Sequence, residues 1–161
     1  MVGRGGAHSR RASIAMDPLE QRSLRELAAA LRSHQVKAST LVMRALSSRR
    51  LGAYREVDEE QAVRQADAAD AALAEGSDCG PLQGIVVSVK DLYGVPGYRT
   101  YGGCPSPLPE RFERPGPVVQ KVLDQRSVVI GKTHTVQFAF GGVGTNPHHP
   151  TPINPWDPVD H

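Results

Sequence analysis

A lysine at the end of an apolar segment is the residue in this sequence best placed to do chemistry. Residues 85–89 are β-branched and almost wholly apolar, which predicts a buried strand, and Lys90 follows directly. Open α/β sheets bind ligands at the carboxyl ends of their strands. A lysine there is either a solvated strand end or a buried base, because burial favours the neutral amine that a base requires.

Two other patterns near this lysine predict no chemistry of their own. Ser88 lies two residues before Lys90 and therefore on the same face of the strand. A serine–lysine pair needs an oxyanion hole, and nothing nearby supplies one, so a small side chain packed in a strand is the favoured interpretation. Residues 131–133 read Gly-Lys-Thr, but a phosphate-binding loop needs glycine at position 126, where Arg126 stands.

The histidines and cysteines of the chain predict neither a metal site nor a cofactor. His148 and His149 are adjacent, so their side chains diverge in an extended loop. Cys79 and Cys104 are too few for a disulfide framework and indicate free thiols in a reducing cytoplasm.

The elements that must position Lys90 follow from periodicity and capping. Apolar residues recur at helical spacing after Ser23, which forms a capping box with Glu26. Further helices are expected over residues 40–50, capped by Ser39, and over residues 58–75, ended by Gly76. Residues 93–116 are expected to form a long loop. A short helix with Pro117 in its first turn and a second buried strand over residues 128–130 then complete a strand–helix–strand unit with parallel strands.

Composition limits the classes of function. The 161 residues are 39% hydrophobic and 22% charged, which is typical of a globular protein. The net charge of only +2 argues against a nucleic-acid partner. No apolar run approaches the roughly 20 residues of a membrane span. Residues 1–16, rich in arginine and glycine, are expected to be a disordered extension, and residues 17–161 to be part of one domain.

Several segments, in order, resemble the amidase signature family. Residues 81–92 (PLQGIVVSVKDL) resemble its strand-and-lysine motif. Residues 131–133, Phe138-Ala139 and 141–146 resemble its second motif, and residues 154–157 (NPWD) the segment before its serine-rich signature. The resemblance implies an α/β fold with helices around a mixed sheet. It also implies a Ser–cis-Ser–Lys triad, with Lys90 as the buried catalytic lysine.

The same resemblance assigns the other site residues and leaves alternatives open. It places the glycine-rich turn near the substrate; its candidate binding residues are Gly141, Gly142, Thr145 and Asn146. Both family serines follow the NPWD segment, so we expect the 161 residues to be a truncated, inactive N-terminal part. The parent activity would be hydrolysis of a linear carboxamide. The alternatives are a non-catalytic pseudogene product or binding fragment, and the A subunit of a glutamyl-tRNA amidotransferase-like complex. The implied partners are a small amide and, as an open possibility, a second copy in a homodimer.

One departure from the family pattern lies in the turn before the second strand. Gln125-Arg126-Ser127 stand where the family uses an Ala-Gly-Ala-like turn of small residues. With other departures, this one suggests a divergent member of the family or a decaying gene.

Overall fold

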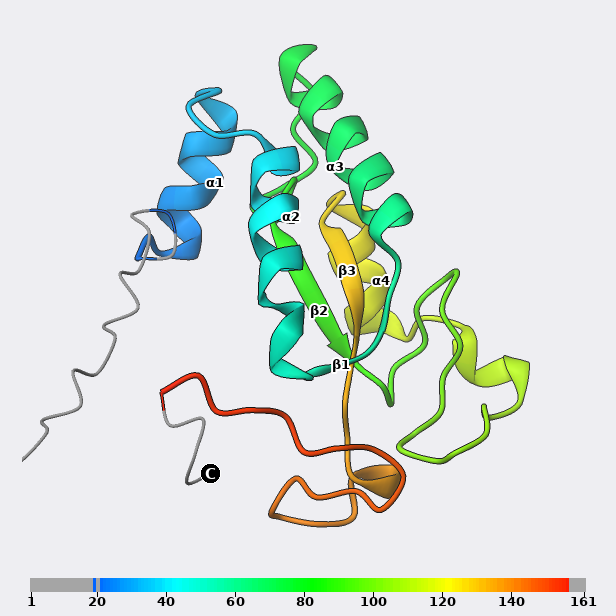
Figure 1. Ribbon diagram of the computed structural model, residues 1–161. Coiled ribbons are helices and arrows are strands. Elements are labelled where there is room, and N and C mark those ends of the chain that lie inside the picture. Colours follow the sequence, from blue (N-terminus) through cyan, green and yellow to red (C-terminus); the bar gives the residue numbers. More distant parts are fainter. Residues whose placement is uncertain (1–18, 20, 157–161) are drawn as a thin grey trace, which may run out of the picture.

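The computed structural model describes residue 19 and residues 21–156 (Figure 1). The expected disordered extension over residues 1–16 and the last residue of the NPWD segment, Asp157, lie outside the described residues. The described chain is a mixed α/β structure, as the sequence predicts.

The first and third helices begin close to where the sequence predicts. α1 (Leu24–Arg32) starts after Ser23, whose backbone N–H and hydroxyl exchange hydrogen bonds with Glu26 in a capping box. α3 (Glu59–Ala74) starts after Asp58, which accepts the N–H of Gln61. Both predictions are confirmed because the signals that specify them lie within one helical turn.

The second helix differs from its prediction at both ends. α2 runs over Ala38–Ser47, and a 3₁₀ turn, η1 (Ser48–Leu51), follows it. The expected cap, Ser39, lies inside the first turn. The cap comes instead from α3, where the Asp70 carboxylate accepts the N–H of Ala38 at 2.7 Å and the N–H of Ser39 at 3.2 Å. The helix can therefore begin two residues early, because a tertiary contact satisfies its first amides.

Three strands form one mixed sheet. β2 (Val86–Lys90) and β3 (Val128–Thr133) are parallel, and α4 (Pro117–Asp124) connects them with a proline in its first turn. β1 (Tyr54–Val57), which the sequence analysis did not predict, pairs antiparallel with β3. The order is β1-β3-β2, so β3 is central. Short 3₁₀ turns, η2 (Glu110–Glu113) and η3 (Gln137–Ala139), interrupt the two long loops.

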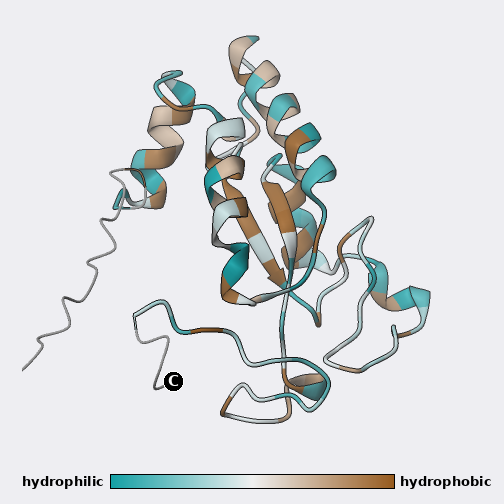
Figure 2. Ribbon diagram, in the orientation of Figure 1, coloured by the Kyte–Doolittle hydropathy of each residue, from teal (hydrophilic) through white to brown (hydrophobic). Residues whose placement is uncertain are grey.

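Helices cover both faces of the sheet. α2 and α3 lie side by side over one face, and α4 lies behind the other (Figure 1). The larger core joins the alanine-rich face of α3 to β3, and a smaller one joins α4 and the 95–98 segment to the opposite face. Figure 2 shows the apolar strands enclosed between polar outer helix surfaces. The small alanine side chains of α3 allow the helix to approach the strands closely.

The expectation that the first strand is buried is wrong for most of its length. Ile85, just before the strand, is 2% exposed, but Ser88 and Lys90 are exposed and the valines are half-buried. The reason is the position of β2 at the edge of the sheet, where only β3 pairs with it. The second predicted strand, β3, is buried as expected because strands flank it on both sides.

The turn before β3 carries backbone strain. Arg126 has φ of 54°, in the left-handed region where a side chain is disfavoured. Its carbonyl accepts the N–H of Gly84, which ties the turn to the start of β2. Within the described residues, no helix has the length and apolar character needed to cross a membrane.

Candidate active site

Lys90 lies at the carboxyl end of β2, as predicted, but its side chain is exposed. It is the last residue of the strand and is in register with Thr133 of the central strand. The burial that the family resemblance implies for this lysine is therefore not found in the described chain. Lys90 ends a strand at the edge of the described sheet, where only β3 pairs with β2.

The face of the sheet that carries Lys90 also carries two hydroxyl groups. Ser88, which alternation places on the Lys90 face, hydrogen-bonds the phenol of Tyr54 on β1. Burial raises the pKa of this phenol, and the hydrogen bond with Ser88 acts in the opposite direction. Ser88 is therefore engaged with Tyr54, which agrees with its interpretation as a structural residue.

A buried ion pair lies directly behind Lys90. The Lys132 side chain is completely buried, and its Nζ lies 3.0 Å from Oδ1 of Asp91, which is 1% exposed. The Lys132 ammonium also donates to the hydroxyl of Thr100 at 3.2 Å and to the carbonyl of Arg99 at 3.3 Å. All three ammonium protons therefore have an acceptor, which is the condition under which a buried charge is tolerated.

Two loops meet at this end of the sheet and are tied to each other. The backbone N–H of Tyr101 donates to the Asp91 carboxylate, and the N–H of Gly102 donates to the Asp91 carbonyl. Gly102 in turn accepts the N–H of Phe138 at 2.7 Å. The carboxyl ends of β2 and β3, the 99–104 segment and the 137–146 segment therefore form one connected unit.

The four predicted binding residues differ in their exposure and in their hydrogen bonds. Gly141, Gly142 and Thr145 are exposed. Asn146 is half-buried, and its Nδ2 donates to the carbonyls of Gly103 at 2.8 Å and Thr135 at 2.9 Å. Both amide protons of Asn146 are thus used to anchor the turn. The groups left free to meet a ligand are the Thr145 side chain and the backbone of Gly141 and Gly142.

Two histidine rings lie in contact beside this unit, tilted by 40° to each other. The rings of His134 and His149 have centroids 5.0 Å apart, and the Arg55 guanidinium lies 4.0 Å from the centroid of the Tyr101 ring. Burial, followed by the charges of neighbouring groups, lowers the pKa of both histidines, so both are mainly neutral at pH 7. Among the described residues, no group of three His, Cys, Asp or Glu side chains could hold a metal.

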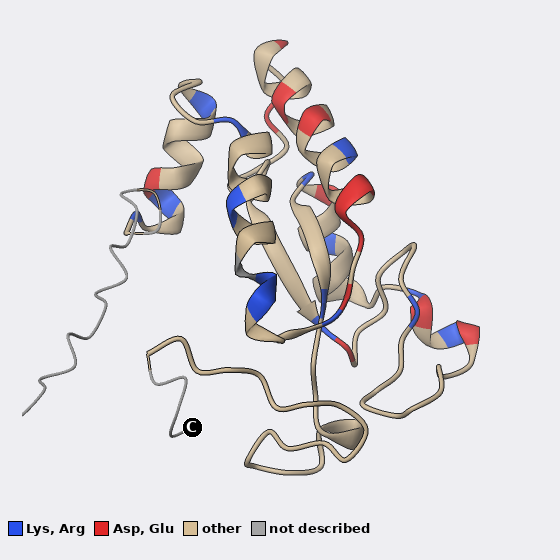
Figure 3. Cartoon of the chain, viewed as in Figure 1, with Lys and Arg blue, Asp and Glu red and all other residues tan. Residues whose placement is uncertain are grey.

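Charge is distributed unevenly around the site. Figure 3 shows charged residues along the helices and near the ends of the strands, while the last loops are tan. Residues 133–156 contain no Lys, Arg, Asp or Glu. These loops instead present apolar side chains, with Phe140 95% exposed and Trp156 86% exposed.

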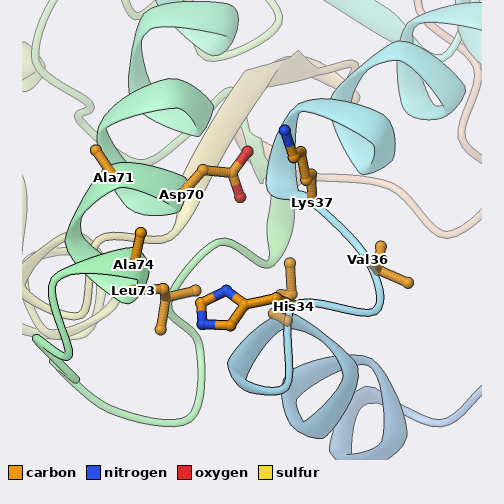
Figure 4. A pocket seen from close by; sticks show the side chains of 8 residues that line it. His34, Val36, Lys37, Asp70, Ala71, Leu73 and Ala74 are labelled. Carbon is orange, nitrogen blue, oxygen red and sulfur yellow. The ribbon is translucent and has the colours of Figure 1, made fainter.

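A cavity of about 280 Å³ lies at the other end of the molecule and is not part of this site. It is formed where the α1–α2 connection meets the end of α3 (Figure 4). Its acidic residue, Asp70, points toward the start of α2, where it caps the helix. Its lining residues are Leu31, His34, Val36, Lys37, Asp70, Ala71, Leu73 and Ala74.

Sequence reasoning did not find the ion pair behind Lys90. The Gly-Lys-Thr pattern that contains Lys132 suggested only a phosphate loop and the family's second motif. The available signal was a lysine that directly follows the buried segment 128–131. Such a lysine needs a buried acceptor, and the pattern alone does not identify Asp91, which is 41 residues away.

Comparison with known proteins agrees with this fold. The family profile described as Amidase matches residues 38–160. The match covers more than half of the chain, and the fold and Lys90 motif agree with it. This chain belongs to the amidase family, whose members include the amidase signature enzymes.

Individual relatives show how much of the family domain is covered. A 2-amino-5-chloromuconic acid deaminase of Comamonas testosteroni is 46% identical over 144 residues, covering 86% of this chain and 31% of the relative. The A subunit of the human mitochondrial glutamyl-tRNA(Gln) amidotransferase is 36% identical over 141 residues, covering 84% of this chain and 26% of the relative. The chain therefore spans less than a third of the length of these curated relatives.

Solved structures give the same result for the fold. A crystal structure of an amidase superposes with a TM-score of 0.78 at 30% identity, covering 85% of this chain and 32% of that chain. A peptide amidase of Stenotrophomonas maltophilia superposes with a TM-score of 0.71 at 22% identity, covering 86% of this chain and 31% of the peptide amidase. This likeness shows a shared fold and nothing more. The described chain thus corresponds to about a third of an amidase signature enzyme.

Proposed function

We propose that the whole protein hydrolyses a carbon–nitrogen bond of a small molecule and that Lys90 is the terminal base of its catalytic triad. The observation that carries the proposal is the position of Lys90 within its motif: it is the last residue of a parallel strand, in register with the central strand, and its side chain is exposed. A base is useful only where a reacting partner can approach it. The carboxyl end of a parallel strand is where open α/β sheets receive ligands.

The proposed chemistry follows the family mechanism. The Lys90 amine accepts a proton through a bridging serine, which activates a nucleophilic serine. On an amide, the nucleophile attacks the carbonyl carbon, ammonia or the amine leaves with a proton, and water releases the acid from the acyl-enzyme. On a 2-amino unsaturated acid the nitrogen is not bound to a carbonyl carbon, so the attack falls on C2 of the imine tautomer, ammonia leaves, and water releases the 2-oxo acid. In the family both serines lie C-terminal to the segment matched here, so the lysine is the part of the triad that this chain supplies.

The relatives suggest where to look for the substrate. The 46% identical relative is named for the deamination of 2-amino-5-chloromuconic acid, so we propose a small acidic amino compound or its amide as the first substrate class. The amidotransferase A subunits are 36–38% identical, which makes glutamine the second candidate donor of ammonia. The higher identity of the deaminase places its substrate class first.

Release of ammonia tests these alternatives in one assay, since each candidate reaction produces it. The protein isolated from its natural host, with its intact mass recorded, is incubated with 2-aminomuconate-type acids, linear carboxamides and glutamine. We expect Lys90→Ala to lower kcat/KM by about 10²–10⁴-fold, the contribution of a general base. Lys121→Ala, on the exposed surface of α4, is the matched control and should stay within about twofold of the wild type.

Two results would contradict the proposal. One is ammonia release by the Lys90→Ala variant at the wild-type rate. The other is no ammonia from any substrate of the panel by a protein that remains folded. Activity on glutamine alone would replace the first substrate class by the second and leave the role of Lys90 unchanged.

A further inference from the structure

The buried ion pair of Asp91 and Lys132 has a position that stability alone does not explain. Both side chains are at most 1% exposed, so both charges have lost their contact with water. The attraction between such charges often does no more than offset this loss, and an apolar pair of similar size is often as stable. A fully satisfied pair does fix geometry, because each of its hydrogen bonds has a preferred direction.

The ion pair of Asp91 and Lys132 holds together the segments that surround Lys90. Asp91 is the next residue in the chain, and its N–H donates to the carbonyl of Thr133, which closes the β2–β3 ladder beside Lys90. The Lys132 ammonium holds the 99–104 segment through the Thr100 hydroxyl and the Arg99 carbonyl. One buried pair thus connects the end of β2, the central strand and the neighbouring loop.

The same loop carries the connection to the predicted substrate turn. The Gly102 carbonyl accepts the N–H of Phe138, and the Gly103 carbonyl accepts one amide proton of Asn146. A Cβ on Gly103 would lie 2.8 Å from the backbone of Gln137, so the two segments are in close backbone contact. The 99–104 segment therefore helps to hold the 137–146 segment in place, beside the bond from Asn146 to the carbonyl of Thr135.

We propose that Asp91 and Lys132 are positioning residues that hold the 99–104 segment, and through it the predicted substrate turn, at a fixed distance from Lys90. The proposal rests on the proposed function, in which Lys90 is the base. Neither residue is assigned contact with substrate. Their effect is exerted through the loop, and a displacement of about 1 Å near a reacting group can lower a rate by about 100-fold.

A double variant separates positioning from stability. Asp91→Asn and Lys132→Met each leave one buried charge without its partner, and each should lower the melting temperature by about 10 °C. The double variant contains neither charge and should recover most of this loss. It also lacks the ammonium that holds Thr100 and Arg99, so the loop should remain loose. The matched control is Arg32→Met with Asp78→Asn, an ion pair at the opposite end of the sheet.

Two readouts distinguish failure of this proposal from failure of the proposed function. Amide hydrogen exchange at Tyr101 and Phe138 should be at least about tenfold faster in the double variant than in the wild type and the control. On any substrate found, kcat/KM should fall by about 10–100-fold while the melting temperature stays close to the wild type. If the wild type releases no ammonia, the proposed function fails, and the exchange rates alone decide the positioning role.

Unchanged exchange at Tyr101 and Phe138 in a stable double variant overturns the proposal, as does unchanged kcat/KM. If the double variant does not fold, Thr100→Val provides the test, because it removes one acceptor of Lys132 and keeps the ion pair and the volume of the side chain. Faster exchange at Tyr101 and Phe138 in that variant supports the proposal, and wild-type exchange refutes it.

Discussion

Replacing Asp70 by alanine tests whether the start of α2 depends on a carboxylate from another helix. The Asp70 carboxylate accepts the Ala38 N–H at 2.7 Å, the Ser39 N–H at 3.2 Å and the Ser39 hydroxyl at 3.0 Å. In Asp70→Ala these donors must turn to water at a half-buried position, or remain without an acceptor. Asp70→Ala should therefore be less stable than the wild type, although alanine has a higher helix propensity than aspartate in α3.

The expected magnitude combines the lost cap with the lost charge on the acceptor. A helix cap contributes about 0.5–2 kcal/mol, and hydrogen bonds to a charged group about 1.5–3 kcal/mol, so we expect a loss of about 2–3 kcal/mol. For a protein of this size that corresponds to a fall in melting temperature of about 4–12 °C.

Thermal unfolding followed by circular dichroism measures this loss. The control is Asp67→Ala, one turn earlier on the exposed side of the same helix, which gains the same helix propensity and loses no cap. The difference between the two variants isolates the contacts to α2. If the melting temperatures of the two variants lie within about 1 °C of each other, Asp70 does not stabilise the start of α2, and the local sequence of α2 determines where the helix begins.

Two further predictions concern the turn before β3 and the acid stability of the chain. Arg126→Gly removes a side chain from a left-handed residue and should stabilise the fold by about 1 kcal/mol, whereas Arg114→Gly at φ of −72° should destabilise it. Guanidinium unfolding of both variants measures the difference, and equal losses would argue against strain at Arg126. The hydrogen bond from Arg32 lowers the pKa of Asp78 from 3.8 to about 2. The contribution of this pair is therefore present above about pH 4 and lost as the pH falls toward about 2. Between about pH 4 and about pH 2 the melting temperature of Asp78→Asn should fall less steeply with decreasing pH than that of the wild type. If the two plots of melting temperature against pH are parallel, protonation of Asp78 does not contribute to the acid sensitivity of the fold.

Local signals explain which elements could be predicted. The Ser23 and Asp58 caps, the alanine face of α3 and Pro117 at the start of α4 each act within a turn or two of chain. The position of Lys90 at a strand end is of the same kind, because it depends only on the apolar run before it. Its family motif then suggested what that position is for.

The elements that were missed depend on partners far away in the sequence. β1, Tyr-Arg-Glu-Val, has too few apolar residues to predict a strand and is ordered by its pairing with β3. α2 starts earlier than predicted because Asp70 accepts the N–H of Ala38. Asp70 is 32 residues away in the sequence, so no local pattern indicates this contact. The exposure of Lys90 in the described chain goes with strand order, which no local pattern encodes and which puts β2 at the edge of the described sheet.

The sequence by itself determined the helices, the two parallel strands, the lysine motif and the family. Each of these is specified by periodicity, capping or motif order within a short stretch of chain. Only the tertiary structure decided that Lys132 and Asp91 meet behind Lys90, that Asn146 anchors its turn and that Asp70 caps α2. These contacts exist because a buried charge or amide must find a partner, and the partner it finds is set by which segments the fold brings together.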